Sequence, residues 1–347
     1  MRSSIVIKRL RRFLGNAAGF GRSAEHNTSS HAGKVTVHEA TEQVVDGIDP
    51  RLRLVPGYKR KLKGEVAAAL AHIGDLVDQV PGPIDVSRMT FVRDPRVSAL
   101  FATPDELQAT FSCSPELRAF FAEVKNSEED ECYALLCANR EEKSVLGTEL
   151  AGDTVRREVF QTAINFHDHK ILSPAANDRD VRDGIKHCIF DGLVTHALRH
   201  IYDIKTRRKD LEDQRRILHA RLRARQAQGN GLSQLLAEAH GGDDQSEDIK
   251  TKIAEAERTL ERMPGSQGVL SFYLEEVRNI FARPEEFIRL NVACFRLTDM
   301  GIKVNGDTPQ PANTVCFSEL EITNVMKRVV TVVRYARDDM NCPDKSF

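Results

Sequence analysis

Hydrophobic residues recur in steps of three and four over a long central stretch of the chain, residues 182–263. This spacing places one narrow apolar stripe along a helix and turns it toward a partner helix. Glycine and asparagine interrupt the stretch at 229–231, and two glycines follow at 241–242. We therefore predict two arms that fold back as an antiparallel coiled-coil hairpin. Its seam comprises Val194, Ala197, Ile201, Ile204, Leu211, Arg215, Leu218 and Leu222 in the first arm, and Ile249, Ile253, Ala256 and Leu260 in the second.

Arg215 suggests a register for this hairpin, because a charged side chain is unusual in an apolar seam. Ala256 is the small residue of the second arm, so it would leave room for the arginine stem while Glu255 or Glu257 pairs with the guanidinium. Setting Arg215 opposite Ala256 fixes the remaining partners, which are Leu222 with Ile249, Leu218 with Ile253, Leu211 with Leu260, and Arg208 with Met263.

Helical spacing also dominates residues 35–130, which we predict to form an N-terminal helical domain. Residues 58–80 repeat apolar positions at helical intervals and end before a Pro-Gly-Pro sequence. Three short helices should follow, each opened by a capping side chain before a proline, at Asp94, Thr103 and Ser114.

The pattern becomes strand-like in two separate segments. Residues 133–137, 144–150 and 154–164 look extended, with a turn expected at 139–143, and residues 288–294, 315–322 and 328–335 look extended near the end of the chain. Together they would make five to seven strands, a normal sheet size. The expected fold class is α+β, with one antiparallel sheet built from 131–178 and 264–340 and the hairpin 179–263 inserted between them.

In the run Val329–Val333 every residue except Thr331 is apolar, so both faces of the expected strand are apolar. A strand of this kind must be covered on both sides of its sheet. We expect one cover to be a helix over residues 266–282, which would pack through Leu270, Leu274 and Val277.

Composition excludes several classes of protein. The 347 residues carry a formal net charge of −1, so no field of the whole molecule favours nucleic acid. No window of about 18 uncharged apolar residues predicts a membrane span. The first residues lack the apolar run of a secretory signal, and the seven cysteines are odd in number and not spaced in pairs. We therefore expect a cytoplasmic protein with reduced thiols.

Residues 1–34 are basic and poor in acids, and we expect a disordered tail. Two other interpretations stay open. Apolar residues within 5–14 could form one face of a short basic helix in weak contact with a membrane surface. The Arg-rich, acid-free composition is also typical of an organelle transit peptide.

Two histidine pairs are the candidate metal ligands. His167 and His169 are two apart on an expected strand, and His196 and His200 are four apart on an expected helix, so each pair would share a face. Nothing in the sequence brings the pairs together into the four-ligand site that zinc requires. We therefore expect ordinary surface or half-buried histidines, with no metal and no cofactor.

Residues 205–225 contain nine Lys or Arg and three acids, whereas residues 243–262 of the facing arm contain seven acids and four bases. Salt bridges between the two arms are the expected use of these charges. The leading hypothesis is a non-enzymatic interaction or scaffold protein that presents the hairpin to a protein partner or to a second copy. The alternatives are a metal-dependent enzyme that uses His167 and His169, and nucleic-acid binding by the basic arm 205–225.

Overall fold

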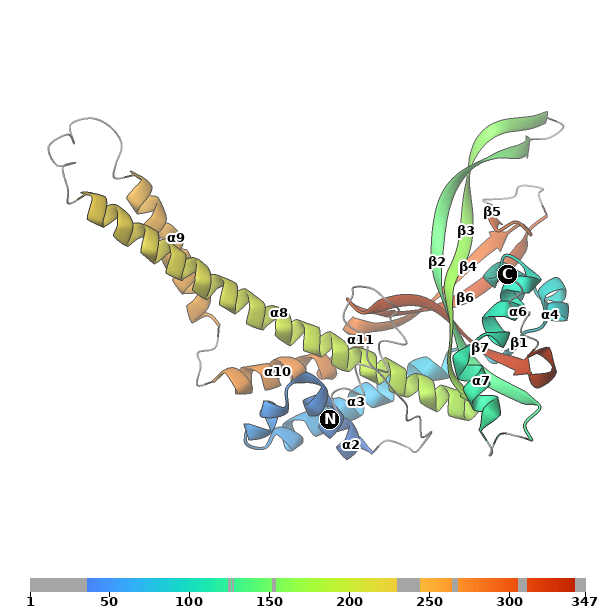
Figure 1. Cartoon of the computed structure of the whole chain (residues 1–347), viewed down its shortest axis with the longest axis horizontal. Helices are drawn as coiled ribbons and strands as arrows, with labels where there is room; N and C mark the ends of the chain where they lie inside the picture. The colour runs from blue at the N-terminus through green and yellow to red at the C-terminus, as the bar shows by residue number, and fades with distance from the viewer. Residues whose placement is uncertain are drawn as a thin grey trace.

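The computed structural model describes residues 36–123, 126, 128–151, 154–229, 244–263, 268–304 and 311–340. A central body carries two projections, as Figure 1 shows. One is a helical hairpin made by α8 (Asp178–Gly229) and α9 (Asp244–Glu261), and the other is a two-stranded ribbon made by β2 (Glu131–Ala151) and β3 (Thr154–Ala175). The expected basic tail, 1–34, lies outside the described residues.

The two strand-rich segments supply six strands of one sheet of seven described strands, and the N-terminal segment supplies β1; the order is β1-β7-β2-β3-β5-β4-β6 with an additional β6–β7 pairing. The remaining strands are β1 (Ile84–Asp85), β4 (Ile288–Leu297), β5 (Ile302–Lys303), β6 (Asn313–Ile322) and β7 (Met326–Ala336). β2 pairs with β7 from Glu131 opposite Ala336 to Ala138 opposite Val329, which confirms the discontinuous sheet. The sheet is mixed rather than antiparallel, because β1 joins β7 in parallel.

Both faces of the sheet are covered, as the apolar pattern of β7 predicts. Val330 and Val332 enter a larger core, which also contains residues of α2 (Val37–Ile48), α3 (Tyr58–Asp78), α8 and α10 (Val269–Ala282). Val329 and Val333 enter a smaller core with α4 (Arg88–Arg93), α5 (Pro95–Leu100), α6 (Pro104–Ser112) and α7 (Pro115–Ala122). The expected cover by Leu270, Leu274 and Val277 of α10 is present in the larger core.

The N-terminal segment is helical, and its predicted caps are present. Asp94, Thr103 and Ser114 each accept a backbone N–H at the start of a helix, and a proline occupies the first turn. Short one-turn elements complete the chain, namely η1 (Pro50–Leu54), α11 (Pro284–Phe287) and η4 (Arg337–Asp339).

The turn expected at 139–143 is wrong, because β2 continues without a break through these charged residues. Their partners lie on β3, where Glu141 faces Asn165 and Lys143 faces Ala163. A ribbon that leaves the body exposes much of both faces to water, so polar residues can occupy consecutive strand positions there. The sequence lacks the apolar alternation of a half-buried strand for that reason.

The first half of α8 belongs to the body rather than to the hairpin seam. Val194, Ala197 and Ile201, which we assigned to the seam, are at most 1% exposed and lie in the larger core. Close packing requires glycine at Gly192, since an added Cβ would lie 2.4 Å from Cδ1 of the buried Ile322. The apolar stripe does run along α8, but its first half packs against the body and its second half packs against α9.

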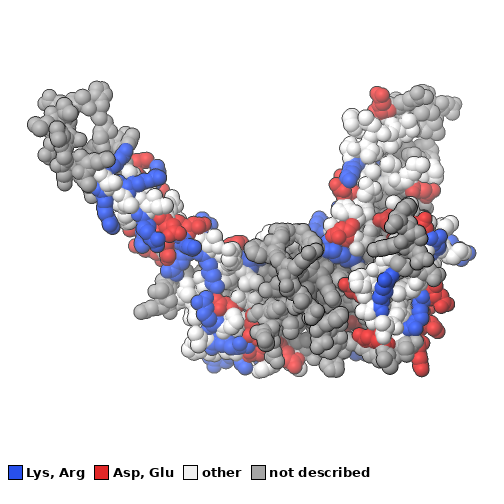
Figure 2. Space-filling model, viewed as in Figure 1, with Lys and Arg blue, Asp and Glu red and all other residues white. Residues whose placement is uncertain are grey.

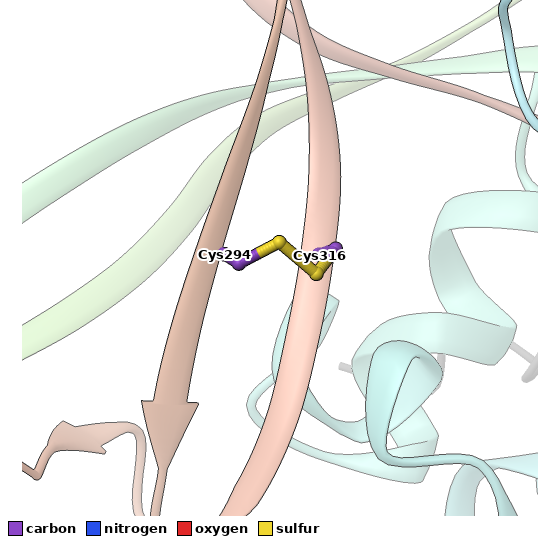
Figure 3. Close-up of a disulfide and its surroundings, with 2 residues drawn as sticks. All are labelled: Cys294 and Cys316. Atoms are coloured by element: carbon purple, nitrogen blue, oxygen red, sulfur yellow. A yellow bond between two sulfur atoms is a disulfide. The ribbon is translucent and has the colours of Figure 1, made fainter.

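The expectation that all cysteines are reduced is also wrong. Cys294 of β4 and Cys316 of β6 stand directly opposite each other in the ladder and form a disulfide (Figure 3). They are 22 residues apart, so sequence spacing gives no sign of the pair. Cys113, Cys132, Cys137 and Cys188 are not disulfide-bonded.

Candidate interaction surface on the helical hairpin

The hairpin leaves the body at Lys205. Ile204, a residue of the predicted seam, packs against the larger core. The Lys205 ammonium donates to Asp49 at 2.9 Å and lies 5.0 Å from the centre of the Tyr273 ring. Asp49 has a side chain only 8% exposed, and its pKa is held well below the ordinary value by Arg51 and then by Lys205. The contact therefore anchors α8 to both η1 and α10.

Beyond this anchor α8 packs against α9, and the hairpin closes on its own apolar residues. Leu218, Ile253 and Ala256 are buried, between 5% and 7% exposed. The other predicted seam residues of the projecting part are partly buried, namely Leu211, Leu222, Ile249 and Leu260. The residue-by-residue register, and its coiled-coil geometry, stay predictions.

Arg215 differs from its expected environment, because it is exposed rather than half-buried over Ala256. Glu257, one of its two expected partners, lies 3.5 Å from Nε2 of His219 and links the two arms there. A long side chain at the border of a two-helix seam can turn its head into water, which removes the need for a partner.

Charged side chains cover the flanks of the hairpin, as Figure 2 shows, with Lys and Arg spread along it and Asp and Glu among them. Several pairs form within one arm, including Arg208 with Glu212 and Lys252 with Asp248, both at 2.9 Å. Exposed pairs of this kind contribute little stability. Lys209 and Arg223 are exposed and, within the described residues, have no acidic partner. The flanks are therefore open to a binding partner.

A shallow groove crosses the hairpin near the middle of the projection. Its wall includes Ile217, which is 53% exposed, and the buried Leu218. Charged and polar side chains surround these two apolar residues, namely Asp210, Asp213, Gln214, Arg221 and Lys252.

The expected pairing of His167 with His169 on one face does not occur. β2 advances two residues from Cys137 to Asn139 while β3 advances three, from His167 to Lys170, so β3 contains an extra residue at this point. Asp168 accommodates it with φ of 54°. One added residue inverts the alternation of faces. His167 is exposed beside Glu141, whereas His169 lies against Phe101 and bonds to the Leu100 carbonyl at 2.7 Å.

His196 and His200 lie on the part of α8 that packs on the body. His196 is 6% exposed, which differs from the expected surface position, and its Nδ1 lies 2.7 Å from the Thr323 carbonyl. His200 pairs with Glu276 of α10 at 2.9 Å. Burial lowers the pKa of both His169 and His196, so these two rings favour the neutral form.

None of these histidines has the surroundings of a metal ligand. Across the residues that the structure describes, no three His, Cys, Asp or Glu side chains converge as a metal site would require. The buried thiols Cys132 and Cys137 are also poor nucleophiles, since burial raises the pKa of each to about 12. The donor groups therefore give no support to the metal-dependent enzyme.

No described helix is both long enough and apolar enough to cross a lipid bilayer. Comparisons with family models, with curated proteins and with solved structures find no match for this chain.

Proposed function

We propose that this protein is a non-enzymatic interaction protein of the cytoplasm, which presents the distal part of the α8/α9 hairpin to a protein partner or to a second copy of itself. The observation that carries the proposal is the path of α8, which continues beyond its anchor at Lys205 for a further 24 residues to Gly229. A helix that leaves its domain, and that packs there against its own return arm among the described residues, offers its flanks as a binding surface.

In this proposal the seam holds the hairpin together and the groove contacts the partner. Leu218, Ile253 and Ala256 keep the two arms together, so they are not available to a partner. Ile217 and the surrounding charges are available, and an apolar contact with a polar rim is the usual composition of a protein interface. Specificity would come from the charged flanks.

Site-specific photo-crosslinking in cells tests the proposal. A photoreactive residue replaces Ile217 in one variant and Met89 of α4 in the other; the two side chains are 53% and 62% exposed. We expect a defined adduct, either with one protein or with a second copy, from position 217 and not from position 89. Equal adducts at both positions, or none at 217, would contradict the proposal.

A nucleic acid is the second candidate partner, favoured by the exposed cations Lys209, Arg215 and Arg223 of α8. If this surface binds phosphates, the logarithm of the binding constant falls linearly with the logarithm of salt, with a slope of about −0.9 per phosphate contacted in duplex DNA. Replacing Arg215 and Arg223 by Ala should then make the slope shallower, whereas replacing Lys61, an exposed base of α3, should not.

A further inference from the structure

The disulfide lies where one face of the β4/β6 ladder passes from the core into solvent. On this face Ile288 stands opposite Ile322, and both are 1% exposed in the larger core. Three pairs farther along, Cys294 and Cys316 are exposed, and their neighbour Val292 is 67% exposed. No helix of the larger core reaches this end of the ladder with a buried contact among the described residues.

The other face of the same ladder is packed. Phe295, Leu297, Val315 and Phe317 all lie in the smaller core and are at most 9% exposed. β4 and β6 also keep ten consecutive paired residues, from Ile288 to Leu297. These contacts do not depend on the S–S bond, so the β4/β6 ladder can remain folded when that bond is broken.

The cross-link is close to the support of the ribbon. After β4 the chain turns at Gly301, whose carbonyl accepts the amide of Ile164 at 2.9 Å. Lys303 of β5 then pairs with Thr162 of β3, and the Val304 amide returns to the Arg296 carbonyl at 2.8 Å. Through these bonds the end of β4 holds the base of the ribbon.

We propose that Cys294 and Cys316 form a reversible thiol–disulfide exchange site, reduced by a dithiol, whose state sets how firmly β4 and β5 hold the β2/β3 ribbon. A thiolate of the dithiol attacks one sulfur, the S–S bond breaks, and the leaving thiolate takes a proton. The second thiol of the reductant then attacks the reductant sulfur of the mixed disulfide; the reductant's own S–S bond forms, and the second protein cysteine leaves as a thiolate and takes a proton. The protein gains two electrons and two protons, and the dithiol becomes a disulfide.

Both cysteines of the pair are exposed residues, as the exchange requires, and this distinguishes them from the buried thiols Cys132 and Cys137. Opening the cross-link frees the segment between residues 294 and 316 from one constraint, while both strands stay paired. The looser end of the ladder is the end that carries Gly301 and β5. Reduction thus acts on the ribbon without unfolding either core.

Differential alkylation of the full-length protein under native conditions provides the first test. In protein kept oxidised, Cys294 and Cys316 should resist a soluble alkylating reagent, and after treatment with dithiothreitol both should be labelled. Cys113, which is exposed, should be labelled in both samples, and Cys132 and Cys137 in neither. Labelling of the pair before reduction, or resistance after it, would overturn the proposal.

Amide hydrogen exchange provides the second test. Reduction should speed exchange in residues 296–304 and 160–166 by about tenfold or more, and leave the paired residues 132–138 of β2 unchanged. The double variant Cys294→Ser/Cys316→Ser should exchange like the reduced protein and show no response to dithiothreitol. Identical exchange in the oxidised and reduced protein would refute the link to the ribbon, even where the alkylation succeeds.

Discussion

Removing the hairpin should leave a folded body, and the structure indicates where the cut belongs. The deletion runs from Thr206 to Gln267, which keeps Lys205 in contact with Asp49 and Tyr273. Because Lys205 touches Tyr273 and Gly268 lies five residues before Tyr273 on α10, the new ends are within roughly 20 Å, which a flexible Gly/Ser linker of about 12 residues can span. Closing such a loop costs roughly 2 kcal/mol through its length-dependent term.

A second deletion, one residue longer, provides the matched control. Removing Lys205 as well leaves Asp49, whose side chain is only 8% exposed in the intact protein, with Arg51 but without its other cation. Losing one of the two cations that pair with this buried carboxylate lowers the free energy of unfolding by about 1–2 kcal/mol. For a body of this size the melting temperature then falls by roughly 2–8 °C.

Thermal unfolding followed by circular dichroism, with size-exclusion chromatography of each variant, measures both effects. We expect the shorter deletion to melt cooperatively as a monodisperse protein, and the longer one to melt cooperatively at a lower temperature. Aggregation or a non-cooperative melt of the shorter deletion would show that the body needs the hairpin, and our division of α8 at Lys205 would then be wrong. Equal melting temperatures of the two deletion variants would show that Lys205 does not anchor α8 to the body.

Three further predictions follow from buried positions. Leu218→Ala should destabilise the hairpin by about 2 kcal/mol and speed amide exchange in residues 206–225, while the melt of the body is unchanged, because the seam is separate from both cores. Gly192→Ala should destabilise the protein by about 1–2 kcal/mol in urea unfolding through overpacking, whereas Gly64→Ala on the open side of α3 should stabilise it by up to about 1 kcal/mol; the reverse order would contradict the packing. Burial lowers the pKa of His169 and His196 in the native protein, whereas histidines of the unfolded chain keep a pKa of about 6.5. Below that pH the unfolded chain binds more protons than the native protein, so stability should fall as pH drops through this value. Replacing both histidines by Asn should reduce the change in the urea unfolding midpoint between pH 7.5 and 5.5. An unchanged pH dependence would exclude the two histidines as its cause.

Local chemistry made several elements predictable from the sequence. A capping side chain before proline defines a helix start within a few residues, so Asp94, Thr103 and Ser114 could be placed without tertiary information. The apolar positions on both faces of β7 required two covers, and the structure has them.

Features that depend on partners distant in the chain could not be predicted. A heptad stripe states that a helix is packed, but it does not name the partner, so Val194 and Ile201 could not be assigned to the body. The added residue at Asp168, which separates His167 from His169, is visible only once β3 is paired with β2. The union of Cys294 with Cys316 likewise follows from the register of β4 and β6.

The continuity of α8 has a mechanical consequence. Its 52 residues form one rod of about 78 Å, clamped along its first half and free along its second. A tilt of about 5° at Lys205 would move the end at Gly229 by roughly 3 Å, because the free part is about 36 Å long. A load applied at that end is felt as torque at Asp49 and Tyr273, and next at the Thr323 carbonyl held by His196. The rod is therefore a lever with two arms of similar length, and the inner arm is buried in the larger core.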